Sequence, residues 1–352
     1  MKAKDALRKL VGFPTSEERR QAEKKKEREL IQRVQKAEKT RVAKEREKAQ
    51  KNQKSVEDLQ LRVIEDYEAD ARRPDFDARI PHPALNYNQK PCQSYAVYKD
   101  VFAREALLRQ LPALLGLGGY APGKDFTLLD YGCGLGRLAY AFTSFFHPAT
   151  QGSHHYYGYE VHPKALAFLQ DAYRIYPNVT VFGEPIAVED SYVEIHEGER
   201  SEAEEGPERI GATQVRLGSR IGRPVDVQFS SSVFTHMYRP AIVSVLKEIA
   251  TLMKPGGVCV NTWLVVDQLA DASLRCGLAD RALPFENKEE GFLYYLENNP
   301  LMCTAYRLDA IKAIYAEAGH EIVDIRWGHW SGREPTHDFS RQDAIISRPL
   351  GG

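Results

Sequence analysis

The sequence has few cysteines and lacks the spacing that would pair them. Five cysteines are spread over 352 residues, and no two form a CxxC pair. A zinc site or a disulfide framework is therefore not expected, no metal is predicted, and a reducing compartment fits this cysteine usage. The chain also lacks a signal-peptide pattern and any apolar run near the roughly 20 residues of a membrane span. These absences favour a cytoplasmic protein.

Glycine and proline are absent from residues 16–54, which consist almost entirely of Lys, Arg, Glu, Gln and Ala. That mixture favours helix. Opposite charges recur at i,i+4 spacing, for example Arg19 with Glu23 and Glu29 with Arg33, where the side chains meet on one helix face. Lys and Arg outnumber Glu here although the formal net charge of the whole chain is −1. The sequence therefore predicts a basic helical arm.

Several interpretations of this arm stay open. Its apolar residues are sparse, which favours a solvated helix or a partly disordered arm. A coiled coil is a further interpretation, weakly supported because the apolar residues do not sustain a heptad pattern. A basic arm also suits nucleic acid or an anionic lipid surface. Residues 1–13 place Leu7, Leu10 and Val11 on one helical face, which is a short interfacial pattern. Peripheral membrane binding or self-association through the N-terminal helix is the corresponding prediction.

Beyond residue 85 the composition becomes that of a globular domain. We expect residues 1–85 to form the charged helical arm and a connector, and residues 86–352 to form one domain. With 43% hydrophobic residues, the chain can bury a full core. Two segments interrupt the pattern of this domain, about residues 184–223, which are acidic, and about residues 267–306.

Short apolar runs alternate with amphipathic helical segments along the domain. Strands are expected at 126–131, 156–160, 178–182, 225–230, 256–266, 320–327 and 341–347, and helices at 95–117, 135–146, 163–176, 239–253 and 308–319. Strands that alternate with helices of ten or more residues imply right-handed crossovers. The predicted fold is α/β, with a Rossmann-like, mostly parallel seven-stranded sheet and helices on both faces.

A glycine turn follows the first strand in "LLDYGCGLG". Gly132, Gly134 and Gly136 let the backbone turn tightly and approach a ligand, and the following helix offers free N–H groups. A dinucleotide site would need GxGxxG, but here Arg137 stands at the position of its third glycine. Asp130, two residues before the turn, would repel a pyrophosphate and suits a ligand with an ammonium group.

This stretch resembles motif I of class I S-adenosylmethionine (SAM)-dependent methyltransferases. "YYGYE" resembles the next motif, "VDVQFSSSVFTHM" the fourth, "MKPGGVCVNTW" the fifth strand with its turn, and "WGHWSGREPTHDFSRQDAIIS" the end of glycan and natural-product methyltransferases. The resemblance covers about Tyr87 to Ser347. It implies SAM as cofactor and Glu160 as the acid that binds the ribose hydroxyls. The cofactor-binding residues expected from it are Asp130, Gly132, Gly134, Gly136, Glu160, Glu184 and Ser230. For Glu184, a solvated loop glutamate fits the sequence equally well.

Histidines supply the candidates for acceptor chemistry. His236 lies beyond the fourth strand and is the candidate general base, because imidazole titrates near neutrality. The alternative is that His236 caps the following helix or orients a loop. His329, Trp330, Arg333 and His337 form a second cluster before the last strand, and the first three are predicted to bind substrate because an aromatic ring beside Arg suits a sugar or an anionic group. Core packing plus a salt bridge explains this cluster as well.

The sequence therefore predicts a SAM-dependent methyltransferase that methylates oxygen in a glycan or a small hydroxylated metabolite. The fourth motif lacks the Asn/Asp-Pro-Pro-aromatic form used for planar amines, so nucleic acid is the less favoured acceptor. The alternative is an RNA- or protein-binding factor with a SAM-binding fold and a basic helical arm.

Overall fold

The structure is a computed structural model in which part of the chain is described. The described residues are 58–85, 94–146, 153–184, 217–279, 285, 287–289, 291–294 and 300–351. Residues 1–57 lie outside them, so every prediction for the basic arm stays a prediction. Residues 185–216, most of the first interrupting segment, lie outside them too. The chain divides into two compact units, 1–63 with 91–93, and 64–90 with 94–352. The second unit contains the sheet and is described below.

The core of this unit is a seven-stranded sheet with the strand order β10-β11-β5-β4-β1-β2-β3. Its strands are β1 (Phe126–Tyr131), β2 (His154–Tyr159), β3 (Val179–Phe182), β4 (Val225–Ser230), β5 (Met253–Trp263), β10 (His320–Arg326) and β11 (Asp343–Pro349). The pairs from β5 through β4, β1 and β2 to β3 are all parallel. Strand β11 runs antiparallel to both of its neighbours. The predicted mostly parallel seven-stranded sheet is confirmed.

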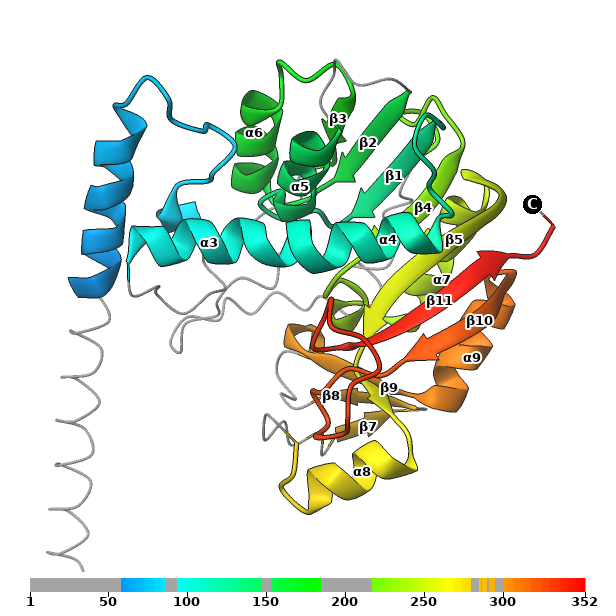
Figure 1. The fold of residues 1–352 in the computed structure, drawn as a ribbon. Coiled ribbons are helices and arrows are strands. Elements are labelled where there is room, and N and C mark those ends of the chain that lie inside the picture. Colours follow the sequence, from blue (N-terminus) through cyan, green and yellow to red (C-terminus); the bar gives the residue numbers. More distant parts are fainter. Residues whose placement is uncertain are drawn as a thin grey trace, which may run out of the picture. The chain divides into compact units, whose positions relative to one another are not determined.

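Helices cover both faces of this sheet (Figure 1). They are α4 (Leu111–Leu117), α5 (Arg137–Phe145) and α6 (Pro163–Ala172) on one face, and α7 (Arg239–Ala250) and α9 (Leu308–Glu317) on the other. Successive strand residues point to opposite faces. Leu128 of β1 accordingly packs in a buried cluster with residues of α4, α5 and α6. Its neighbour Leu129 packs in a second cluster with residues of α7 and α9. The Rossmann-like arrangement expected from the sequence is therefore confirmed.

The helix predicted for residues 95–117 contains a wider turn. It consists of α3 (Tyr95–Glu105), a π-helical turn η2 (Ala106–Gln110) and α4. The N–H of Leu111 donates to the carbonyl of Ala106, five residues back. Pro112 follows at once, and in a regular helix its ring would clash with the carbonyl of Leu108. The π turn therefore accommodates the proline within one continuous helical stretch.

The second interrupting segment folds into a structure that the sequence analysis did not predict. It contains α8 (Gln268–Arg275) and η4 (Pro300–Met302), and its three short strands pair with β6, directly before it, in a four-stranded sheet of order β6-β9-β8-β7. The strands are β6 (Val265–Val266), β9 (Thr304–Arg307), β8 (Phe292–Tyr294) and β7 (Asn287–Glu289). Strands of two to four residues are too short to show an alternating pattern.

The connector before the domain also has regular structure. Residues 58–71 are helical, and η1 (Pro83–Leu85) precedes α3. The hydroxyl of Tyr98 in α3 donates to the carbonyl of Pro81 at 2.8 Å. The boundary at residue 85 stays a prediction. Among the described helices, none combines the length and apolar character that a bilayer crossing needs.

Candidate functional site

The three glycines of the turn after β1 have different surroundings, although all are left-handed, with φ of 79°, 56° and 82°. A Cβ on Gly132 would lie 2.3 Å from Val233 Cγ2, and a Cβ on Gly136 would lie 2.4 Å from Leu169 Cδ2. A Cβ on Gly134 would have no atom within 4 Å. Gly132 and Gly136 thus allow the turn to touch the loop after β4 and helix α6. Gly134 faces open space where a ligand can approach the backbone.

Glu160 follows β2 directly, and its carboxylate lies beside this turn. Its Oε2 accepts the N–H of Gly134 at 2.7 Å, and its Oε1 accepts the N–H groups of Val161 and His162 at 2.8 and 2.7 Å. Burial raises the pKa of Glu160, and the backbone hydrogen bonds oppose that shift. Two bonds saturate Oε1, whereas Oε2 keeps a lone pair for a further donor. The geometry therefore suits a carboxylate that accepts from a ligand hydroxyl beside Gly134.

Asp130 lies in β1, two residues before the turn, and is 4% exposed. Its Oδ2 accepts the hydroxyl proton of Tyr156 at 2.7 Å. Burial raises the pKa of Asp130 to about 7, the Tyr156 hydrogen bond opposes this, and the nearby charge of Glu160 adds to it. The carboxyl is therefore only partly ionised near neutral pH, which weakens the electrostatic attraction for an ammonium group on which the sequence interpretation relied. Its contact with a ligand stays a prediction.

Glu184 lies at the same edge of the sheet as Glu160 but is exposed. A Cβ on Gly183 would lie 1.7 Å from the carbonyl oxygen of Glu160, so the chain leaving β3 crosses directly over the Glu160 backbone. Burial raises the pKa of Tyr159 to about 12, with the charges of Glu184 and Glu160 adding to the shift. The structure therefore brings the two predicted acids together, and the adenine-side role of Glu184 stays a prediction.

Ser230 and Ser232, at the end of β4, have different environments. Ser230 is fully buried and its hydroxyl donates to Asn261 Oδ1 on β5 at 3.0 Å. This hydrogen bond joins Ser230, one of the predicted cofactor residues, to strand β5. Ser232 is exposed and has φ of 60°, which makes it the single non-glycine residue with positive φ in the described part of the chain. Such backbone strain is typical of functional sites.

A ring of hydrogen bonds holds Ser232 in this conformation. Its N–H donates to Thr262 Oγ1 at 2.8 Å, Thr262 donates to Gln342 Oε1 at 2.6 Å, and Gln342 Nε2 donates to Ser232 Oγ at 3.0 Å. Because Ser232 Oγ accepts from Gln342 in this ring, the hydroxyl proton of Ser232 points away from the ring. The sequence analysis missed Thr262 and Gln342, because only the antiparallel pairing of β11 with β5 brings them together.

The predicted base His236 closes a short 3-10 helix, η3 (Phe234–His236). Its Nδ1 donates to the carbonyl of Leu301 in η4 at 2.9 Å, because a carbonyl can only accept. The N-cap of α7 is Tyr238, without a side-chain cap bond, so His236 makes the loop-orienting contact rather than the helix cap. Burial lowers the pKa of His236, and the Leu301 and Met302 backbone oppose that shift. The imidazole is therefore neutral at pH 7.

The second predicted cluster lies in the loop between β10 and β11 and makes internal contacts. Trp330, which is buried, donates its Nε1–H to Asp343 Oδ2 at 2.6 Å. Arg333 forms a forked pair with Asp267 at 2.6 and 3.2 Å and lies 4.2 Å above the ring of Trp327. These contacts match the alternative of packing plus a salt bridge. They fasten the loop to β11 and to the N-terminus of α8.

The contacts in this loop limit which of its side chains are available to bind substrate. His329 is half-buried in the same loop. The Arg333 side chain is 6% exposed, so direct substrate binding would require its forked pair with Asp267 to be replaced. The substrate-binding roles of His329, Trp330 and Arg333 stay predictions.

Replacing Asp130 should change the pH dependence of stability. The folded-state pKa of about 7 exceeds the unfolded value of about 3.9, so the contribution of Asp130 is present at low pH and is lost as pH rises toward 7. Asp130→Asn keeps an acceptor for Tyr156 and does not titrate. Relative to wild type, its free energy of unfolding should therefore rise by roughly 2–3 kcal/mol between pH 5 and pH 8. Urea denaturation at both pH values measures this, and a constant difference would contradict it.

The left-handed conformation of Ser232 predicts an unusual order of stability for two variants. Ser232→Ala and Ser232→Gly both remove the hydroxyl, but only glycine relieves the backbone strain. We expect the glycine variant to be more stable than the alanine variant by about 1 kcal/mol, since a left-handed residue with a Cβ costs roughly 1–2 kcal/mol and the entropy of glycine offsets part of that. Thermal unfolding of both variants measures the difference. Equal stability would mean that Ser232 is unstrained.

No protein-family model matches the sequence. Among solved structures, the glycopeptide N-methyltransferase MtfA in complex with sinefungin is 13% identical, with a TM-score of 0.40, over 69% of this chain and 86% of its own. A SAM-dependent methyltransferase from Clostridium acetobutylicum is 11% identical, with a TM-score of 0.40, over 73% and 98%. Magnesium protoporphyrin IX methyltransferase from Synechocystis with bound S-adenosylhomocysteine is 15% identical, with a TM-score of 0.39, over 72% and 87%. The fold assignment rests on the sheet itself, not on these scores.

Proposed function

We propose that the chain is a SAM-dependent methyltransferase that methylates an oxygen of a small hydroxylated metabolite or a glycan. The observation that carries the proposal is the pairing of Gly134, whose Cα faces open space, with the Glu160 carboxylate 2.7 Å from its N–H. In an open parallel sheet, ligands bind beyond the carboxyl ends of the strands. Gly134 and Glu160 lie at that edge, after β1 and β2.

The residues fit the chemical groups of this cofactor. Glu160 Oε2 has a lone pair for a ribose hydroxyl, and Gly134 gives access to the backbone. Bound SAM supplies an electrophilic methyl group on a sulfonium; transfer breaks the C–S bond, forms a C–O bond and leaves S-adenosylhomocysteine. The protein has to align the acceptor and exclude water. The acceptor hydroxyl also loses its proton, and His236 is the proposed base because its lowered pKa keeps it neutral at pH 7.

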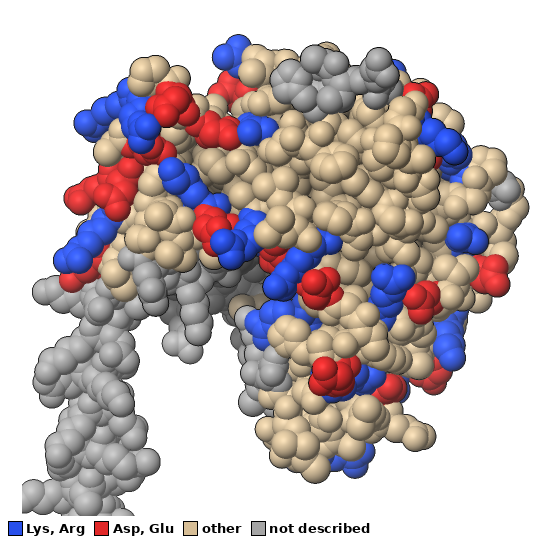
Figure 2. All heavy atoms as spheres, viewed as in Figure 1, with Lys and Arg blue, Asp and Glu red and all other residues tan. Residues whose placement is uncertain are grey.

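An RNA- or protein-binding role remains the alternative function. Figure 2 shows basic and acidic side chains interspersed over the face in view, and many form ion pairs, such as Arg104 with Asp100 on α3 at 2.9 Å. A mixed surface of this kind gives little electrostatic attraction to RNA. The proposed source of such attraction is the basic arm at 16–54, outside the described residues. RNA binding that weakens with salt and is lost when residues 1–54 are deleted would favour the alternative.

Cofactor binding is the first test of the proposal. Calorimetry should show that the full chain binds SAM and S-adenosylhomocysteine and does not bind NAD. Glu160→Ala should weaken S-adenosylhomocysteine binding by about 10- to 100-fold, because a hydrogen bond to a charged group contributes roughly 1.5–3 kcal/mol. Gly134→Val should weaken it too, by filling the open space. Wild-type affinity in the Glu160 variant would remove that residue from the site.

Two variants control for unrelated effects. Gly256 has a left-handed φ of 79° and, like Gly134, has no atom within 4 Å of its would-be Cβ. It lies near the start of β5, at the opposite edge of the sheet. Gly256→Val therefore introduces the same backbone strain without touching the site and should retain affinity. Glu321→Gln, an exposed position on β10, controls for the loss of a negative charge.

The proposed base gives a separate kinetic prediction. His236→Ala should leave S-adenosylhomocysteine affinity nearly unchanged and lower the methylation rate by about 10²–10⁴-fold. Because burial lowers the pKa of His236, the wild-type rate should be level above about pH 6.5 and fall at lower pH. The variant should lack this fall. An unchanged pH profile combined with a lower melting temperature would make the contact with Leu301 purely structural.

A further inference from the structure

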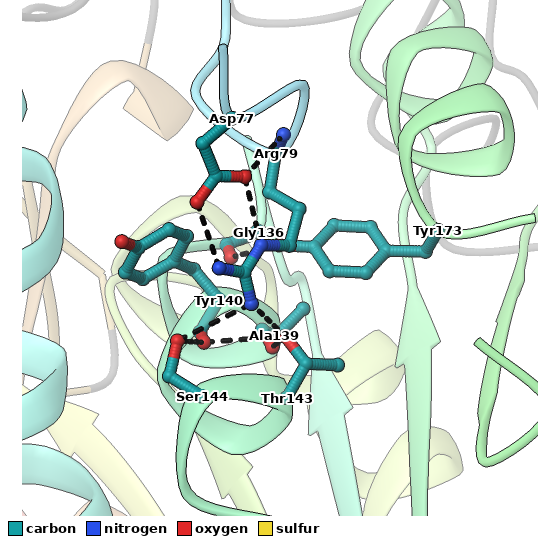
Figure 3. Close-up of polar contacts among 8 residues, drawn as sticks. All are labelled: Asp77, Arg79, Gly136, Ala139, Tyr140, Thr143, Ser144 and Tyr173. Carbon is teal, nitrogen blue, oxygen red and sulfur yellow. Dashed lines mark hydrogen bonds and ion pairs between the residues drawn. The ribbon is translucent and has the colours of Figure 1, made fainter. Parts of the chain in front are cut away.

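Arg79, which comes from the segment between the helix at 58–71 and η1, reaches onto helix α5. Figure 3 shows its guanidinium between Asp77 and the helix. Nε and Nη2 donate to the two carboxylate oxygens of Asp77 at 2.9 and 2.7 Å. Nη1 donates to the hydroxyls of Thr143 and Ser144 at 3.0 and 3.3 Å. One guanidinium therefore joins a segment before the sheet to two side chains of α5.

The two hydroxyls are oriented to receive this contact. Thr143 donates its own proton to the carbonyl of Ala139 at 2.8 Å, and Ser144 donates to the carbonyl of Tyr140 at 2.7 Å. Their lone pairs are therefore turned toward Arg79. The guanidinium carbon also lies 4.5 Å from the centre of the Tyr140 ring, at a distance where a cation is attracted to the ring face. The Arg79 side chain is 16% exposed, so the guanidinium itself is largely shielded from water, although Ser144 at the rim of the contact is exposed.

The same helix carries the glycine turn. Helix α5 begins at Arg137, directly after Gly136, and the N–H of Tyr140 donates to the carbonyl of Gly136 at 2.8 Å. The hydroxyl of Tyr173 donates to that carbonyl at 3.3 Å, and its ring lies next to Arg79 in Figure 3. The position of α5 thus fixes where the turn ends. A shift of α5 would move Gly134 relative to Glu160.

We propose that Arg79 is a positioning residue for the cofactor-binding turn, acting through α5 and held in place by Asp77. This inference rests on the proposed function. The forked pair with Asp77 fixes the plane of the guanidinium, and this leaves Nη1 aimed at the helix. Lysine cannot reproduce the arrangement, because an ammonium group lacks the planar fork that serves a carboxylate and two hydroxyls together.

The test measures S-adenosylhomocysteine affinity by calorimetry, together with melting temperature, in the full chain. Arg79→Gln should weaken affinity by about tenfold, within the range reported for residues that couple to a site without touching the ligand. Arg79→Lys should be intermediate. Thr143→Val, which keeps the volume but removes the acceptor, should weaken affinity in the same direction. The double variant with Arg79→Gln should lose less affinity than the sum of the two single losses, because both substitutions remove the same hydrogen bond between Arg79 and Thr143.

Two controls separate positioning from general loss of stability. Arg73 pairs with Asp70 and Asp75 in the same segment, so Arg73→Gln should retain affinity. Ile311→Val trims a fully buried side chain of α9, which packs on the opposite face of the sheet. It should lower the melting temperature without changing affinity. Wild-type affinity in Arg79→Gln, or an equal loss in Ile311→Val, would overturn the proposal. A wild-type chain that binds no S-adenosylhomocysteine would instead overturn the proposed function, and with it this role of Arg79.

Discussion

The hydrogen bond from the Gly134 N–H to Glu160 joins the ends of two neighbouring strands, and the site depends on it. β1 and β2 are parallel and in register up to Tyr131 and Tyr159, so their carboxyl ends emerge side by side. The turn after β1 then needs an acceptor for an N–H that no helix satisfies, and Glu160 supplies one at 2.7 Å. Because Glu160 also accepts from Val161 and His162, its position is set by backbone and not by a flexible partner.

Two carboxyl groups near one turn would repel each other if both were charged and exposed. The structure separates them by environment. Burial raises the pKa of both groups, that of Asp130 to about 7. Asp130 accepts one hydroxyl proton, from Tyr156, whereas Glu160 accepts three backbone N–H groups, which oppose the rise in its pKa. Glu160 is therefore the carboxylate with the stronger hydrogen-bond support for a negative charge. Asp130 joins β1 to β2 through the Tyr156 hydroxyl, a contact that its place in the motif does not reveal.

The sequence predicts the sheet well because its strands and helices carry local signals. The expected strands at 126–131 and 225–230 agree residue for residue with β1 and β4. The strands β7, β8 and β9 of the second sheet escape prediction, because strands of a few residues draw their stability from pairing with distant partners and not from their own pattern. The glycine turn was predictable from residue type and spacing, and the resemblance to methyltransferase motifs pointed to Glu160. Thr262 and Gln342 were not, since 80 positions separate residues that share a hydrogen bond.

Residues that the sequence analysis did not single out therefore influence how the glycine turn and the loop after β4 are held. Arg79 lies in a stretch that the sequence marks only as a proline-punctuated connector, yet 64 positions separate it from the Thr143 hydroxyl that it contacts. Gln342 lies at the entry to β11, which is antiparallel to β5 and so brings a side chain to the same edge as the loop after β4. Both contacts are directional: the Thr143 hydroxyl is already oriented by its bond to Ala139, and the Gln342 amide also accepts from Thr262. The motif supplies the groups that are proposed to contact a ligand, and distant segments fix the orientation of those groups.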